Sequence, residues 1–187
     1  MKRACCLLVA VFCCFCMAGT AWAGFSIGLE NRIIENAVTN HFSLYESYDL
    51  AKNVQLFGFS TTSESYCEGY AGVGYLAKSW LQISAGLGLE TNPNPWRITA
   101  SLWTGKGPAS LLAIYENGGS GYWYKILATY SLGKYVAVGV HTKRFMGIGP
   151  YLQVKMPFYT NCVVYVVPGY DWETKTIKTI VSISLNY

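Results

Sequence analysis

Charged residues and long apolar runs are both scarce in this chain of 187 residues. Asp, Glu, Lys and Arg make up 13% of the sequence, against roughly 25% in ordinary soluble domains. Past residue 18, no apolar run reaches the length that a transmembrane helix needs. The first shortage argues against an ordinary soluble surface, and the second excludes a multi-helix membrane protein. A chain that is also 16% aromatic is either a β-sandwich with a large core or a transmembrane β-barrel.

Cysteine is plentiful only at the start of the chain, where five of the seven fall within the first sixteen residues. Two basic residues precede an apolar segment over residues 5–18, which is short for a membrane span. Small residues follow it, so we expect a secretory signal peptide over residues 1–23, with an uncleaved anchor as the alternative. The residues expected to define the A-x-A cleavage site and the new N-terminus are Ala21, Ala23 and Gly24.

Export would remove most of the cysteine and part of the charge. Only Cys67 and Cys162 remain after cleavage, which excludes a disulfide-rich secreted scaffold. The formal charge of +4 includes Lys2 and Arg3. The remaining charge of about +2 is too small to favour a nucleic-acid partner. No linker or charge run divides residues 24–187, so we expect a single domain there.

Alternation of apolar and polar residues predicts β-strands. In residues 80–90, Leu81, Ile83 and Leu87 share one face, and small or polar residues occupy the other. The same alternation is clear in residues 122–132, 135–143, 150–156 and 177–187. It is weaker in residues 53–61, 109–116 and 162–170.

Turn residues between these segments give nine strands from Tyr66 onward. Their short connections favour an antiparallel meander. Bacterial outer-membrane barrels have an even number of strands, so the residues before Tyr66 must supply one strand or three. Residues 25–29, 41–48 and 53–61 fit three strands, which predicts twelve in all. An amphipathic helix over residues 29–40 would instead leave ten, and we favour twelve.

An apolar row continues to the last residue of the chain, formed by Val181, Ile183, Leu185 and Tyr187. Lipid would cover such a row in a membrane barrel, and barrel closure would pair every backbone group. In these features the chain resembles bacterial outer-membrane β-barrel proteins as a class. The row itself resembles the terminal signal that the barrel-assembly machinery recognises. The resemblance implies a Gram-negative outer-membrane location, outer-membrane lipid and the assembly machinery as partners, and aromatic girdles at both interfaces.

The expected fold is therefore all-β: a closed antiparallel up-and-down transmembrane β-barrel with short loops on both sides. A periplasmic C-terminus places Cys162 at the periplasmic end of its strand and Cys67 near the extracellular end of its own. About 25 Å of hydrocarbon would then separate the two sulfurs, whereas a disulfide requires Cα atoms within about 7 Å. We expect no disulfide.

Catalytic, metal-binding and phosphate-binding motifs are missing from the sequence, so no metal and no cofactor is expected. His41 and Ser43 keep the H-x-S spacing of outer-membrane lipid A deacylases, which they resemble, but lack the Asn that follows in that motif. On a strand the two side chains would share a face about 7 Å apart. They are candidates for a nucleophilic pair, and a polar histidine at the rim or in the lumen is the simpler interpretation.

Charged residues gather on the phase opposite to the apolar rows and are therefore expected to line the lumen. This set comprises Glu68, Glu90, Arg97, Lys125, His141, Lys143, Lys155 and Lys178. Such charges either pair into a structural plug or line a water-filled path. Their excess of basic residues favours anions, such as acidic saccharides.

The sequence thus predicts a porin-like transport protein, a narrow pore for small polar or anionic solutes, or else a structural barrel. Two alternatives stay open: an outer-membrane enzyme acting on lipid A or phospholipid, and a soluble secreted β-barrel that binds a hydrophobic ligand. An enzyme is the less favoured reading. The oligomeric state is not defined by the sequence.

Overall fold

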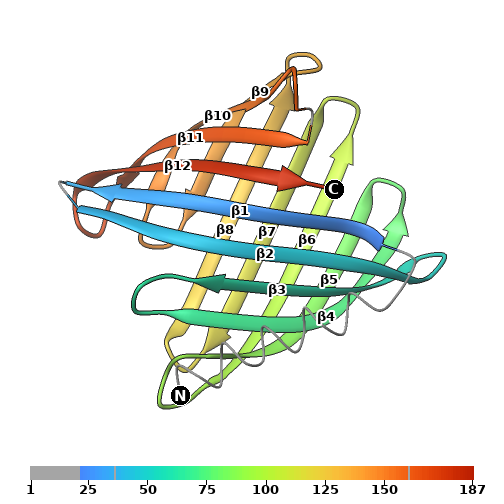
Figure 1. Cartoon of the computed structure of the whole chain (residues 1–187), viewed down its shortest axis with the longest axis horizontal. Helices are drawn as coiled ribbons and strands as arrows, with labels where there is room; N and C mark the ends of the chain where they lie inside the picture. Colours follow the sequence, from blue (N-terminus) through green and yellow to red (C-terminus); the bar gives the residue numbers. More distant parts are fainter. Residues whose placement is uncertain (1–21, 36, 160) are drawn as a thin grey trace.

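A closed antiparallel β-barrel of twelve strands forms the whole of the structure, a computed structural model that describes residues 22–187 except 36 and 160 (Figure 1). The strands are β1 (Trp22–Ile34), β2 (Ala37–Ala51), β3 (Val54–Thr62), β4 (Cys67–Lys78), β5 (Leu81–Glu90), β6 (Trp96–Lys106), β7 (Ala109–Gly118), β8 (Gly121–Ser131), β9 (Val136–Lys143), β10 (Gly147–Lys155), β11 (Cys162–Asp171) and β12 (Thr176–Asn186). Each strand pairs with its neighbours in the sequence, and β1 pairs with β12 to close the ring. The prediction of twelve strands is confirmed.

Residues 29–40, where a helix was the alternative, belong to the β1–β2 hairpin. Glu35 has a positive φ of 55° in the turn between the two strands. Connections elsewhere are short, from two residues at 52–53 to six at 156–161. Within the described part of the chain, no helix is long and apolar enough to span a membrane.

The two faces of each strand differ as the alternation predicts. On β12, Ile177 is 70% exposed on the outside, while Lys178 and Ser182 are buried inside. On β5, Leu87 is 72% exposed. An exterior of this kind is stable only against lipid, so the fold does not fit a soluble barrel.

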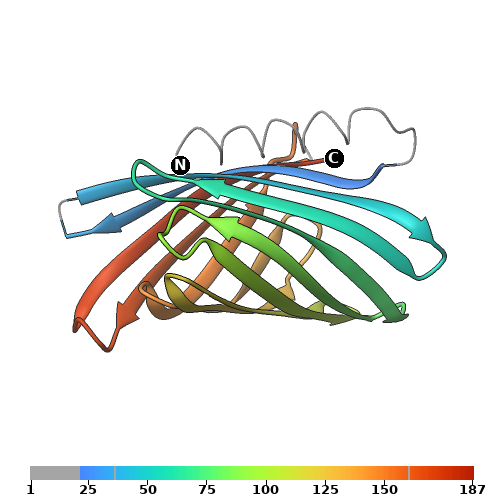
Figure 2. The same ribbon diagram turned by 90° about the horizontal axis from the view of Figure 1, so that it is seen from below.

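The seam between β1 and β12 runs along both strands, from Ile34 and Lys178 to the rim where the chain ends. Backbone N–H groups of Phe25 and Tyr187 each donate to the carbonyl of the other residue, at 2.8 and 2.7 Å. We call this end of the barrel the C-terminal rim and the other end the opposite rim. Even-numbered strands run toward the C-terminal rim. In Figure 2, β1 and β2 lie on the wall facing β7 and β8.

Aromatic rings occupy part of the lumen, in addition to those on the outside. Phe57 contacts the rings of Tyr45 and Tyr70, with centroids 6.4 and 6.2 Å away. The inward faces of Gly72 and Gly86 leave room for this packing, since a Cβ on Gly72 would lie 2.6 Å from the Phe57 ring. The expectation that aromatic residues form girdles is therefore incomplete, because a ring inside a narrow barrel fills space that small wall residues leave.

A second packed region lies inside β9–β12. Its core is formed by the buried side chains of Met146, Tyr151, Val167 and Ile180. The partly buried side chains of Ile34, Leu127 and Tyr165 pack against it. The lumen is thus partly filled on both sides, and the charged residues lie between and beside these apolar regions.

Candidate functional site

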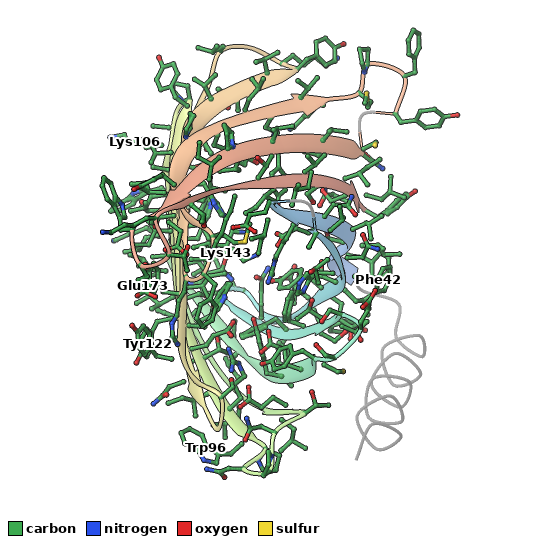
Figure 3. The ribbon with its side chains drawn as sticks, turned by 90° about the vertical axis from the view of Figure 1, so that its left-hand side faces the viewer. Phe42, Trp96, Lys106, Tyr122, Lys143 and Glu173 are labelled. Atoms are coloured by element: carbon green, nitrogen blue, oxygen red, sulfur yellow. The ribbon has the colours of Figure 1, made fainter. Side chains whose placement is uncertain are left out.

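Three cations and one carboxylate meet inside the barrel, in what we call the Glu30 group: Glu30, Arg32, Lys125 and Lys143. Lys143 Nζ lies 2.5 Å from Glu30 Oε1, and Arg32 Nε lies 2.6 Å from the same oxygen. The Tyr165 hydroxyl donates to Glu30 Oε2 at 3.1 Å. These side chains come from β1, β8, β9 and β11. Figure 3 shows Lys143 inside the barrel.

Lys125 has no such partner. It lies directly opposite Lys143 in the β8–β9 register, and no carboxylate among the described residues lies within 4.0 Å of its amine. Like charges that face each other across two strands repel. The Glu30 group therefore carries a local excess of two positive charges.

A second charged assembly, the Arg97 group, lies near the opposite rim. Arg97 forms ion pairs of 2.6–2.7 Å with Glu68, Glu90 and Glu116, and all four side chains are buried. They come from four consecutive strands, β4–β7. One guanidinium with three carboxylates gives this wall an excess of negative charge, opposite in sign to the Glu30 group.

Hydrogen bonds complete the Arg97 group. The Tyr66 hydroxyl donates to Glu68 at 2.6 Å and to Glu90 at 2.7 Å. Burial and the neighbouring Glu68 raise the pKa of the Tyr66 phenol well above its usual range, so it remains a donor. Ser120, in the β7–β8 turn, donates to Glu90 from its backbone N–H and its hydroxyl. The group therefore ties two connections of the opposite rim to the barrel wall.

A third charged assembly is a single ion pair that joins β11 to β12. Lys178 Nζ lies 2.5 Å from Asp171 Oδ2 and donates to the Phe145 carbonyl at 2.8 Å. This pair is complete by itself and lies in the wall at the opposite rim.

A cavity of about 470 Å³ lies at the C-terminal rim. Its lining combines two tyrosines with amides, hydroxyls and one lysine: Tyr151, Gln153, Lys155, Asn161, Val163, Tyr165, Ser184 and Asn186. Tyr165 also contacts Glu30, so the cavity adjoins the Glu30 group. It provides a polar approach to that group from the C-terminal rim.

The expected lumen residues are distributed over these features. Six are buried: Glu68, Glu90, Arg97, His141, Lys143 and Lys178. Lys125 is partly buried, and Lys155 is exposed at the cavity. His141 is 1% exposed and stacks against Tyr151, and neither of its ring nitrogens has a hydrogen-bond partner among the described residues.

The proposed enzymatic pair, His41 and Ser43, has neighbours on β1. In the register, His41 lies opposite Glu30 and Ser43 opposite Gly28. The Ser43 hydroxyl donates to the Gly28 carbonyl at 3.4 Å, and no hydrogen bond to His41 is found within the described residues. Those residues likewise hold no group of three or more His, Cys, Asp or Glu side chains that is placed to hold a metal ion.

The remaining predicted residues are those of the terminal row, those of the expected cleavage site and the two cysteines. Ile183, Leu185 and Tyr187 are exposed on the outside of the barrel, and Val181 shares their phase on β12. Ala21 is outside the described residues, whereas Ala23 and Gly24 lie in β1. Cys67 begins β4 and Cys162 begins β11, at opposite rims, and no disulfide joins them.

Sequence reasoning missed several members of the charged groups: Glu30, Arg32, Glu116 and Asp171. Glu30 and Arg32 fall in the segment for which a helix was the alternative, so their common strand face was not evident. Glu116 lies near the end of β7, whose inward residues Leu112 and Ile114 are as apolar as its outward ones. When both faces of a strand are apolar, the sequence does not show which face points inward, so an inward charged residue is not recognised.

Comparisons with known proteins support the fold. No family model matches the chain, and no curated protein matches it. Among solved structures, the KdgM porin aligns with a TM-score of 0.56 and 16% identity, over 87% of this chain and 98% of its own. A structure described as the KdgM porin in complex with disordered oligogalacturonate gives 0.55 and 18% over the same shares. The NanC porin gives 0.53 and 11%, again over 87% and 98%. The chain therefore has the fold of bacterial outer-membrane β-barrels, as its sequence predicts.

Proposed function

We propose that this protein is a narrow outer-membrane pore for small anionic solutes, with acidic saccharides as the favoured class. The observation that carries the proposal is the Glu30 group, in which Arg32 and Lys143 pair with the single carboxylate and Lys125 has no ion-pair partner among the described residues. Excess charge of one sign in a narrow, low-dielectric passage attracts the opposite ion. One neighbour in fold was studied with oligogalacturonate, an anionic saccharide.

The outer-membrane location is part of the proposal. The apolar exterior requires lipid, and a chain of this fold is expected to have its C-terminal rim on the periplasmic side. Export through a cleavable signal peptide also stays a prediction. On this orientation the cavity at Tyr151 and Tyr165 opens to the periplasm, and the Arg97 group lies near the cell exterior.

Ion selectivity of the purified, refolded protein in a planar bilayer tests the proposal. Under a KCl gradient we expect a reversal potential with the sign of chloride preference. Replacement of both Lys125 and Lys143 by Glu is expected to reverse that sign. Lys106→Glu is the matched control, because Lys106 is exposed at the C-terminal end of β6, and its chloride preference should persist. Cation preference in the wild-type protein would contradict the proposal.

A structural barrel without conduction is the second candidate. The apolar packing of Met146, Tyr151, Val167 and Ile180 favours it, because these side chains fill part of the lumen between the cavity and the opposite rim. The same bilayer experiment separates the two candidates. Absence of single-channel events from protein that shows the heat-modifiable migration of a folded barrel would favour the structural role.

A further inference from the structure

The Glu30 carboxylate is held by the barrel in the way a protein holds a bound ligand. Its two oxygens accept from Lys143 Nζ at 2.5 Å and from the Tyr165 hydroxyl at 3.1 Å, and Arg32 Nε adds a contact of 2.6 Å. A lysine, an arginine and a tyrosine hydroxyl are groups that bind carboxylates through charge-assisted hydrogen bonds. The site is therefore built for a carboxylate, and the present occupant belongs to the chain itself.

This contact crosses the lumen. Glu30 belongs to β1 and Lys143 to β9, and the order around the ring places β12, β11 and β10 between them. The two side chains thus meet through the lumen, between strands that are not neighbours in the wall. A solute that passes between β1 and β9 has to separate them.

The charge of the site favours exchange of the occupant. Removal of Glu30 would leave Arg32, Lys125 and Lys143 without a counter-charge, which is costly in a buried environment. A carboxylate that arrives with the solute would replace that counter-charge. Lys125, which faces Lys143 and lacks an ion pair among the described residues, provides a first contact for it.

His141 shows that the closed arrangement, in which Glu30 contacts Lys143, leaves buried polar atoms without hydrogen bonds among the described residues. It lies two residues before Lys143 on the same face of β9 and is buried with both ring nitrogens unpaired among the described residues. Buried polar atoms are nearly always hydrogen-bonded. An arrangement that leaves two of them unpaired is easier to open than one with complete pairing.

We propose that Glu30 is the resting occupant of a carboxylate-binding site formed by Lys143, Arg32, Tyr165 and Lys125, and that a carboxylate solute opens the lumen by displacing it. This inference rests on the proposed function as an anion pore. The solute carboxylate takes the place of Glu30 between β1 and β9, and the Glu30 side chain turns toward the lumen water. Solutes without a carboxylate leave the Glu30–Lys143 contact intact.

The change of the single-channel current on addition of galacturonate, with galactose as the neutral counterpart, reports solute binding and tests the displacement. Glu30→Gln removes the competing charge, so we expect galacturonate to bind about tenfold more tightly than in the wild type, a difference of about 1.4 kcal/mol. Lys143→Gln should weaken galacturonate binding by a similar factor. Galactose should change the current of none of the variants.

Asp171→Asn is the matched control, because it also removes one buried carboxylate from a lysine, at the opposite rim. Its affinity for galacturonate should equal that of the wild type. Glu30→Asp keeps the charge and shortens the side chain, so it serves if Glu30→Gln does not fold, and it should shift affinity in the same direction. Heat-modifiable migration verifies the fold of each variant.

The outcomes separate this inference from the proposed function. Equal affinity in the wild type, Glu30→Gln and Glu30→Asp would overturn the displacement while leaving an anion pore intact. An equal gain in Glu30→Gln and Asp171→Asn would show a general effect of charge and would also overturn it. A wild-type protein that conducts no anions would remove the proposed function itself.

Discussion

Arg97 is the counter-charge for three buried carboxylates. It contacts three carboxylates within 2.7 Å, and its side chain is 3% exposed. A buried ion pair adds little net stability when intact, but removal of one partner leaves charge that neither water nor a counter-ion neutralises. Here removal would leave three buried carboxylates together.

We therefore predict that Arg97→Ala lowers the free energy of unfolding by about 3–5 kcal/mol. Urea unfolding in lipid vesicles, followed by the loss of heat-modifiable migration, measures the change. Lys106→Ala is the control on the same strand, because Lys106 is exposed, and its effect should stay within about 0.5 kcal/mol. Equal effects of the two substitutions would show that the Arg97 group does not stabilise the barrel.

At the scale of the strand, the two faces of β5 offer a direct comparison. Leu87 is exposed on the outer face, whereas the Gln82 amide donates to Gln55 on the inner face at 3.0 Å. We predict that Leu87→Arg costs about 2–4 kcal/mol, as for an arginine near the bilayer midplane. Gln82→Arg should cost less, because Gln82 faces the lumen at the C-terminal rim rather than the lipid. The same unfolding measurement decides, and equal costs would mean that the outside of β5 does not face lipid.

Strands such as β5, β8 and β12 were predictable because each has one apolar and one polar face. The β1–β2 hairpin was harder, since Leu29, Ile33 and Ile34 fit a helical period as well as a strand. The pairing of charges was beyond the sequence for a different reason. Glu30 and Lys143 lie 113 residues apart, and their contact depends on strand number, register and tilt together. The alternation assigns a residue to the lumen but does not assign its partner.

At the scale of the whole molecule, Tyr187 belongs both to the apolar outer row and to the seam that closes the barrel. It ends the apolar row that runs along β12, and its backbone forms two hydrogen bonds with Phe25 at the end of the β1–β12 seam. We predict that deletion of Tyr187, or its replacement by Lys, leaves the protein unassembled in the periplasm. Fractionation and heat-modifiable migration check this, with Tyr187→Phe as the conservative control that keeps the aromatic ring. Normal assembly of the deletion variant would show that the row is not an assembly signal.

The seam also governs when the protein is able to fold. Its pairs join residues near the two ends of the described chain, such as Ser26 with Asn186, so the ring closes over the largest sequence separation available. Loop-closure entropy makes such a contact slow to form, and it cannot form before the last strand has been synthesised. Until the seam closes, β1 and β12 each present an unpaired edge with an apolar outer face. Unpaired edges of this kind are surfaces on which chains aggregate. We therefore expect the unclosed chain to need a partner that covers these edges, and closure of the seam to be the slow step of folding.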